Sequence, residues 1–219
     1  MDWSWFLTED AMVDLPTLIT YSLIVLGFVF IPGPATLLTI ARATTSGPKV
    51  GIATGAGIAA GDIVHTLLAV FGLSAIIAAS ALLFSVIKYV GAAYLIYLGI
   101  KAITSKVAPS FGNGIADVST GTAFRQAFIS EMLNPKTALF FLAFLPQFVQ
   151  PENGYVLLQL TILGFVFVAL GLFSTIVFAL GAGTLGGFVR RNPVILKWQG
   201  KAVGTIFCIL GVRLALQER

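Results

Sequence analysis

Five acidic, basic or histidine residues lie well inside long apolar stretches of this sequence, more than three residues from either end, and they are the side chains best placed to do chemistry. They are Asp62, His65, Lys88, Glu131 and Lys136. A charge at the centre of a bilayer costs about 2.5–3.5 kcal/mol on insertion scales, so such groups are expected to face the protein interior and to pair. A buried carboxylate there can hold a proton or an ammonium group, and a lysine can hold an anion.

The spacing of these residues separates their expected roles. Asp62 lies near the middle of its apolar run, and His65 follows three residues later on the same helix face. We interpret Asp62 as a proton or ammonium site and His65 as a hydrogen-bonded contact between helices. Gly57 and Gly61 lie beside them and allow a second helix to approach closely. Glu131 has three open roles: binding a substrate ammonium, carrying a proton, or neutralising Lys136.

Two proline motifs interrupt the apolar runs near these charges, Pro32-Gly33-Pro34 and Asn134-Pro135-Lys136. Proline removes a backbone donor and clashes with the preceding turn, so an ordinary helix cannot continue through either motif. The half-helix that begins after each break presents free N–H groups, which favour a carboxylate. Thr36 adds a hydroxyl, the Asn134 side chain can cap its half-helix, and Lys136 adds a positive charge. The alternative is that each proline only kinks a transmembrane helix.

The elements that carry these residues must cross a membrane. The chain has 219 residues, of which 58% are apolar and 10% are charged, and its mean hydropathy is +0.97. This composition excludes a soluble domain and a disordered chain. Apolar runs predict six membrane-spanning helices, near residues 17–40, 51–73, 82–103, 124–149, 156–183 and 198–216. With one cysteine and one histidine, we expect no disulfide, no metal centre and no cofactor.

Basic residues gather beside alternate breaks between these runs. The first, third and fifth breaks carry Arg42 and Lys49; Lys101, Lys106 and Arg125; and Arg190, Arg191, Lys197 and Lys201. Basic loops remain in the cytoplasm, so both termini are predicted to be extracytoplasmic. The net charge of +4 therefore has a topological meaning, and we expect no nucleic-acid partner.

The two halves of the chain share motifs in the same order. Lys88-Tyr89-x-Gly91 in the third run matches Lys197-Trp198-x-Gly200 in the sixth, and the two proline breaks fall in the first and fourth runs. Three spans in each half give the halves opposite orientations, which is a plan of secondary transporters with sites at broken helices. The alternative is a chance recurrence in a biased composition.

The predicted fold is therefore an all-α integral membrane protein, with six transmembrane helices in two inverted three-helix repeats and proline-broken helices 1 and 4. The expected organisation is an extracytoplasmic tail (1–16), a first repeat (17–108), a cytoplasmic linker (109–123) and a second repeat (124–219), all in a single membrane domain.

Several of these motifs together resemble the lysine exporter (LysE/RhtB) superfamily of bacterial amino-acid exporters. The matching segments are Ile31-Pro32-Gly33-Pro34, the glycines from Gly51 to Gly61 with Gly72-Leu73, the stretch from Lys88 to Gly99, and the stretch from Asn134 to Phe148. They cover most of residues 28–150, with weaker similarity beyond. Two departures are visible: Ala35 stands where the family often has Asp, and Glu131 where it usually has Asn.

The resemblance implies export of amino acids or their derivatives across the bacterial inner membrane, driven by the proton gradient, with alternating access between the two halves. The expected partners are an amino-acid substrate, protons and membrane lipid, and a homo-oligomer is left open. The predicted substrate-binding residues are Pro32, Gly33, Pro34, Thr36, Asp62, Glu131, Asn134, Pro135 and Lys136.

Three other functions are weighed against this one. A passive channel for a small solute would need no proton gradient. A metal-ion exporter would use the carboxylates for hard cations. A membrane enzyme is disfavoured, because the sequence has no paired cysteines, no histidine-rich motif and no Ser-His-Asp set.

Overall fold

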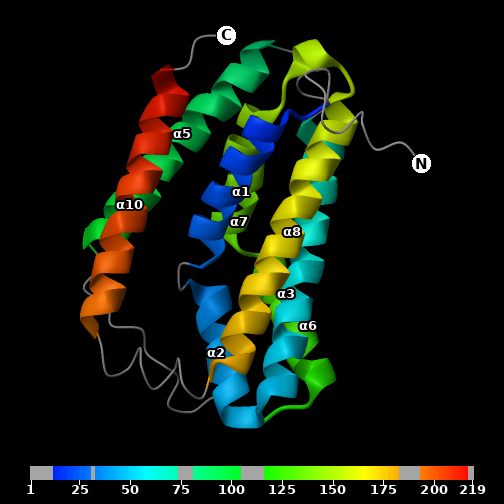
Figure 1. Ribbon diagram of the computed structural model, residues 1–219, viewed down its shortest axis with the longest axis vertical. Helices are drawn as coiled ribbons and strands as arrows, with labels where there is room; N and C mark the ends of the chain where they lie inside the picture. Colours follow the sequence, from blue (N-terminus) through cyan, green and yellow to red (C-terminus); the bar gives the residue numbers. More distant parts are fainter. Residues whose placement is uncertain (1–11, 31–32, 74–80, 105–115, 183–192, 217–219) are drawn as a thin grey trace.

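The computed structural model describes residues 12–30, 33–73, 81–104, 116–182 and 193–216, and every regular element in these segments is helical. The helices form a single bundle in which α1 and α2 run in one direction, α3 returns, and α6 and α7 again run in one direction before α8 returns (Figure 1). They are α1 (Leu15–Val29), α2 (Pro34–Ser46), α3 (Pro48–Leu68), α5 (Ala81–Thr104), α6 (Thr120–Met132), α7 (Pro135–Leu139), α8 (Val156–Leu180) and α10 (Pro193–Leu216). Short π and 3-10 segments are η2 (Ala69–Leu73), η3 (Phe140–Phe144), η4 (Leu145–Phe148) and η5 (Pro151–Asn153).

Two of the described helices are long and apolar enough to cross a membrane. They are Pro48–Gly72 and Val156–Leu180, and the bent pair Thr120–Met132 with Pro135–Phe148 counts as a third if it is one span. The chain is therefore an all-helical membrane protein with two to three candidate spans among the described residues. The arrangement of six spans in two repeats stays a prediction at this point.

Both proline interruptions are present as breaks between helices. α1 ends at Val29 and α2 begins at Pro34, while α6 ends at Met132 and α7 begins at Pro135. The axis bends by 49° at the second break. Each new half-helix starts with proline at its first position, where the missing N–H has no intrahelical partner to lose. Pro32 lies outside the described residues.

Two predicted boundaries shift because capping residues start helices earlier than hydropathy indicates. α1 begins at Leu15, inside the predicted tail (1–16), since the Asp14 side chain accepts a 2.6 Å hydrogen bond from the Thr17 N–H. α6 begins at Thr120, inside the predicted linker (109–123), where Ser119 caps the helix through the Thr122 N–H. Residues 1–11 of the tail and 105–115 before α6 lie outside the described residues.

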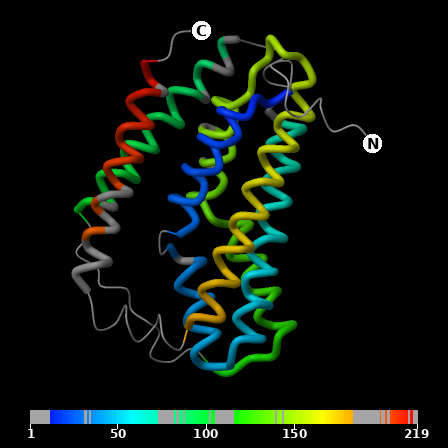
Figure 2. The backbone as a smooth tube through the Cα atoms, in the orientation of Figure 1, coloured from blue at the N-terminus to red at the C-terminus, as the bar shows by residue number. Residues whose placement is uncertain are grey.

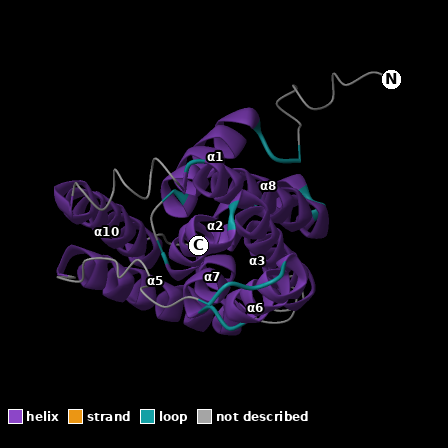
Figure 3. Cartoon of the chain, turned by 90° about the horizontal axis from the view of Figure 1, so that it is seen from below, coloured by secondary structure: helices purple, strands orange, loops and turns teal. Residues whose placement is uncertain are grey.

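Close approach of α3 to α6 depends on the two glycines noted in the sequence. A Cβ added at Gly57 would collide with the Phe124 carbonyl oxygen, and one at Gly61 would lie 2.7 Å from the Glu131 Cβ. On the other side of α3, the side chain of Thr66 occupies the space above Gly164 of α8. The end-on view shows α3 between α6 and α8 (Figure 3). This packing brings Asp62 of α3 beside Glu131 of α6.

The remaining pair, α5 and α10, packs along its own length at one side of the bundle (Figure 2). Gly99, Gly204 and Gly211 form the contact, where an added Cβ would meet backbone atoms of the other helix. An aromatic core joins this pair to the rest: the Phe28 ring centroid lies 5.7 Å from that of Phe207 and 4.6 Å from that of Phe140. These rings form one wall beside the broken helices.

Candidate functional site

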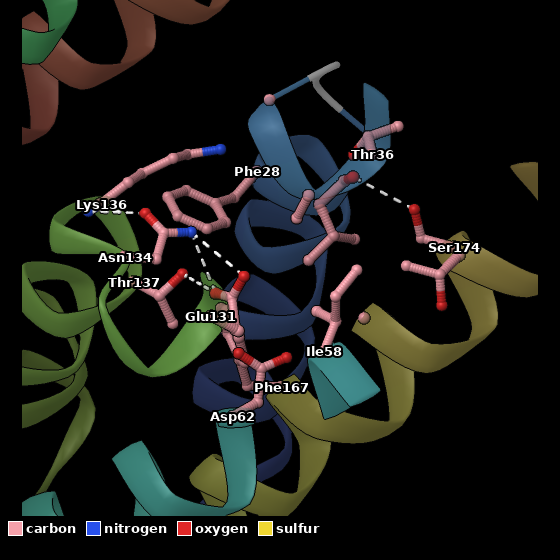
Figure 4. A pocket seen from close by; sticks show the side chains of 15 residues that line it. Phe28, Thr36, Ile58, Asp62, Glu131, Asn134, Lys136, Thr137, Phe167 and Ser174 are labelled. Atoms are coloured by element: carbon pink, nitrogen blue, oxygen red, sulfur yellow. Dashed lines mark hydrogen bonds between the residues drawn. The ribbon is translucent and has the colours of Figure 1, made fainter. Parts of the chain in front are cut away.

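A cavity lined by both polar and apolar side chains lies where the two helix breaks face each other. Its volume is about 50 Å³, several times the roughly 10–15 Å³ that one water molecule needs. Side chains from α1, α2, α3, α6, α7 and α8 surround it (Figure 4). The lining residues are Phe28, Val29, Gly33, Ala35, Thr36, Ile58, Asp62, Glu131, Asn134, Lys136, Thr137, Phe167, Gly171, Ser174 and Thr175.

Glu131 is fixed in place by residues on the far side of the second break. Its carboxylate accepts hydrogen bonds from the Asn134 amide, at 3.0 and 3.2 Å, and from the Thr137 hydroxyl. The Asn134 side-chain oxygen in turn accepts a 3.0 Å bond from the Lys136 N–H, so it caps α7 as the sequence predicts. Glu131 therefore ties α6 to α7 across the break, and both of its carboxylate oxygens already have protein partners.

Asp62 differs in its hydrogen bonding. Its side chain is 2% exposed, close to the 3% of Glu131, yet its Oδ1 has no hydrogen-bond partner among the residues that the structure describes. The carboxylate points into the cavity beside Glu131 (Figure 4). A buried carboxylate oxygen without a donor is costly, and a proton or a cationic donor removes that cost. Asp62 is thus the open acceptor of the cavity.

Lys136 and the start of α2 supply the positive side of the cavity. The Lys136 ammonium lies 3.9 Å from the centroid of the Phe28 ring, which is a close cation–π contact. Gly33 precedes α2, and Thr36 on its first turn is 6% exposed. The Ser174 hydroxyl donates a 3.1 Å bond to the Val29 carbonyl, which the break leaves without its helical partner. With both carboxylates and Lys136 ionised, the net charge is −1.

His65 is a contact between helices, as its position in the sequence indicated. Its Nε2 lies 2.9 Å from the Glu131 carbonyl oxygen, and its ring stacks on Phe141 at a centroid distance of 6.0 Å. His65 does not line the cavity. The bond occupies a backbone carbonyl at the end of α6, just before the break.

Most of the predicted site residues come together, although no observation yet tests their roles. Six of them line the cavity: Gly33, Thr36, Asp62, Glu131, Asn134 and Lys136. Pro34 and Pro135 begin α2 and α7, and the Pro135 side chain is exposed and does not line the cavity. Pro32 lies outside the described residues.

Sequence reasoning missed the lining residues Phe28, Thr137, Ser174 and Thr175. A signal existed for the last two, because Ser174-Thr175 is a polar pair inside the apolar run 156–180. Phe28 carried no signal, since it is one of 18 phenylalanines in the chain. Thr137 is one of several threonines near the breaks and became recognisable only through its bond to Glu131.

Comparison with known proteins identifies similar chains in several bacteria. An "Uncharacterized membrane protein YrhP" of Bacillus subtilis is 37% identical over 163 residues, covering 70% of this chain and 77% of the relative. An "Uncharacterized membrane protein PA4757" of Pseudomonas aeruginosa is 32% identical over 204 residues, covering 90% and 93%. A "Homoserine/homoserine lactone efflux protein" of Salmonella typhimurium is 30% identical over 184 residues, covering 84% and 88%. No solved structure matches the chain.

The model of one protein family, described as LysE type translocator, matches residues 26–218. The match includes both helix breaks and every residue that lines the cavity. A translocator moves a small molecule across a membrane, which agrees with a polar cavity enclosed by apolar helices. This chain belongs to the LysE type translocator family.

Proposed function

We propose that the protein is a secondary active exporter of amino acids or their derivatives across the bacterial inner membrane, coupled to protons by alternating access. Membership of a translocator family supports transport. The name of the Salmonella relative, a homoserine and homoserine lactone efflux protein, supports an amino-acid substrate and the outward direction.

The proposed architecture is two inverted repeats of three spans each, residues 17–108 and 124–219. In support, each half holds one broken helix, one long helix and one helix of the α5–α10 pair, in that order. The start of α1 and the end of α10 lie at the same end of the bundle (Figure 1), as an even number of crossings requires. The basic residues near the opposite end, such as Arg42 and Arg125, favour that end as cytoplasmic.

The proposed substrate site uses opposite sides of the cavity for the two charges of an amino acid. The ammonium group binds Asp62, whose unpartnered Oδ1 is the single observation that carries this proposal. The carboxylate binds the start of α2, near Gly33 and Thr36, with Lys136 as the countercharge. In this proposal Glu131 links α6 to α7 across the second break and keeps its hydrogen bonds to Asn134 and Thr137.

This assignment also supplies a physical reason for proton coupling. A proton and a substrate ammonium both neutralise the same Asp62 carboxylate, so the two compete for one site. Binding of a proton from outside releases the substrate there, and binding of substrate from inside releases the proton. The exchange of one for the other is antiport.

The test is counterflow in proteoliposomes that contain the purified protein and a panel of labelled amino acids, homoserine included. The proteoliposomes are loaded with unlabelled amino acid, and the labelled amino acid is added outside. We expect at least one labelled amino acid to accumulate against its gradient, and a pH step across the membrane to change the extent of accumulation. Exchange that ignores the pH gradient would favour a passive channel, and stimulation only by divalent cations would favour a metal-ion exporter. Folded protein that moves none of the amino acids would refute the proposal.

A further inference from the structure

A buried arginine at the far end of α2 fastens that helix to the start of the second half of the chain. Arg42 is 8% exposed. Its guanidinium donates a 2.6 Å bond to the Ala116 carbonyl and a 2.7 Å bond to the side-chain oxygen of Gln126 on α6. These short bonds from a cationic donor join α2 both to the segment before α6 and to α6 itself.

A second polar contact fastens the opposite end of the bundle. The Gln150 side-chain amide, just after η4, donates a 2.6 Å bond to the Asp14 carboxylate at the start of α1. Gln150 is itself fixed to α8, because its backbone N–H and carbonyl each bond the side chain of Gln159 at 2.8 Å. Gln159 is fully buried.

The two contacts occupy corresponding positions in the two halves. In each, a residue that follows one helix break bonds the broken helix of the other half, or the residues just before that helix. Arg42 lies one turn before the end of α2 and bonds Ala116, just before α6, and Gln126, at the middle of α6. Gln150 ends the segment after the second break and bonds Asp14 at the start of α1. An inverted repeat places such a pair at opposite faces of one membrane protein.

The two contacts also lie on either side of the cavity along the bundle axis. Arg42 is six residues beyond Thr36, or about 9 Å along α2 at 1.5 Å per residue. Asp14 is fourteen residues before Phe28, or about 21 Å along α1 in the other direction. Figure 1 shows the end of α2 and the start of α1 at opposite ends of the molecule.

We propose that these contacts are the two gates of the transporter: an Arg42 latch with Ala116 and Gln126, and a Gln150 latch with Asp14. This inference rests on the proposed transport function. In the proposed cycle, each transport step opens one latch while the other holds. Release of the Arg42 latch frees α2, and release of the Gln150 latch frees η4 from α1.

The Gln150 latch keeps its charge over the ordinary pH range. The hydrogen bond from Gln150, followed by those from Thr17, lowers the pKa of Asp14 below its ordinary value of 3.8. The carboxylate therefore stays ionised in neutral and mildly acidic media, so the latch opens by movement of the helices rather than by protonation of Asp14.

The experiment measures access to the cavity from each side of the membrane separately. Cys208 is the sole cysteine of the chain; it is replaced by serine, and Thr36→Cys then serves as the reporter inside the cavity. A membrane-impermeant maleimide is applied to sealed right-side-out and inside-out vesicles carrying Arg42→Met or Gln150→Leu. Lys49→Met and Glu152→Leu, which change exposed side chains near the same two ends, are the matched controls.

We expect the two latch variants to act in opposite directions. Arg42→Met should raise the labelling rate about tenfold from one side only, and Gln150→Leu should raise it from the other side only. The double variant should label from both sides, and the controls should match the parent. A contact that only stabilises the fold would lower thermal stability without any change that depends on side.

Equal labelling from both sides in each single variant, or no change in well-folded variants, would overturn the gate proposal. If a variant is not monodisperse, Arg42→Gln and Gln150→Met replace it. Labelling needs no substrate, so its outcome is independent of the counterflow test. Side-specific labelling without amino-acid transport would keep the gates and reject the substrate, whereas transport with unchanged labelling would reject only the gates.

Discussion

Replacing each of the two buried carboxylates by its amide should give opposite results, because only one of them has protein partners. Asp62→Asn keeps the shape of the side chain and removes no hydrogen bond from the unpartnered Oδ1. Glu131→Gln replaces one acceptor oxygen by an NH₂ group that must face the Asn134 amide, itself a donor at 3.0 and 3.2 Å. The second variant therefore creates two opposed donors in a buried site.

The expected magnitudes follow from these contacts. Hydrogen bonds to a charged group are worth about 1.5–3 kcal/mol against about 0.5–1.5 kcal/mol for neutral ones, and a buried donor without a partner costs about 1–3 kcal/mol. Loss of charge at Glu131 and one unpaired donor together should lower the free energy of unfolding by about 2–4 kcal/mol. For a chain of this length that is a fall in Tm of roughly 5–15 °C. Asp62→Asn should leave Tm unchanged or raise it.

The assay combines thermal unfolding in detergent with counterflow on the same preparations. Asp62→Asn should be as stable as the parent and inactive, because its amide can neither release a proton nor attract an ammonium group. Asp117→Asn, at an exposed carboxylate, is the control and should change neither quantity. A stable Glu131→Gln protein, or an Asp62→Asn protein that still performs pH-driven transport, would refute the assignment of the two carboxylates.

Three further predictions concern stability and are checked by thermal or denaturant unfolding of the solubilised protein. Gly61→Ala should lower the free energy of unfolding by about 1–3 kcal/mol, since its Cβ would lie 2.7 Å from that of Glu131. Gly27→Ala has nothing within 4 Å of the added Cβ and should raise the free energy of unfolding by up to about 1 kcal/mol. His65→Phe keeps a stacked ring and removes one of the two hydrogen bonds to the Glu131 carbonyl, which keeps its 3.0 Å bond from the Asn134 N–H, so it should cost about 0.5–1.5 kcal/mol; an unchanged Tm would show that the bond is unimportant. Asp14→Ala removes a helix cap and should cost about 1 kcal/mol. Because the folded-state pKa of Asp14 is lowered, that difference should be constant above pH 5 and shrink as the pH falls below its ordinary 3.8; a difference that grows in acid would contradict this sign.

The sequence was sufficient wherever local chemistry decides the structure. Proline forbids a continuing helix whatever surrounds it, so both breaks were predictable, and the cap formed by Asn134 follows from its place before Pro135. The spacing of Gly57 and Gly61 likewise predicted a close helix contact, because only glycine leaves room for it.

The sequence was insufficient where partners come from distant segments. Glu131 and Asp62 are both acidic residues inside apolar runs, and the sequence leaves open which of them binds the proton or the substrate ammonium. The proposed assignment depends on the Thr137 hydroxyl reaching back across a 49° bend, a geometry that spacing alone does not give. Gln150 and Arg42 looked like ordinary loop residues, since their bonding partners lie 136 and 84 positions away.

Placing two carboxylates in one cavity is useful to a transporter only if their partners differ, and the breaks in the helices make that difference. Glu131 lies one turn before its break, so the amide and hydroxyl of the next half-helix fall within reach and saturate it. Asp62 lies inside the unbroken helix α3, where the preceding and following turns use their own backbone groups and offer it no donor. If protein donors satisfied both carboxylates, the cavity would have no free acceptor for a cation. If neither carboxylate had a partner, the cost of burying unpartnered charge would be about twice as large. On the proposed mechanism, the single unpartnered oxygen must therefore hold either a proton or a substrate ammonium in every occluded state, and that requirement is what would tie export to the proton gradient.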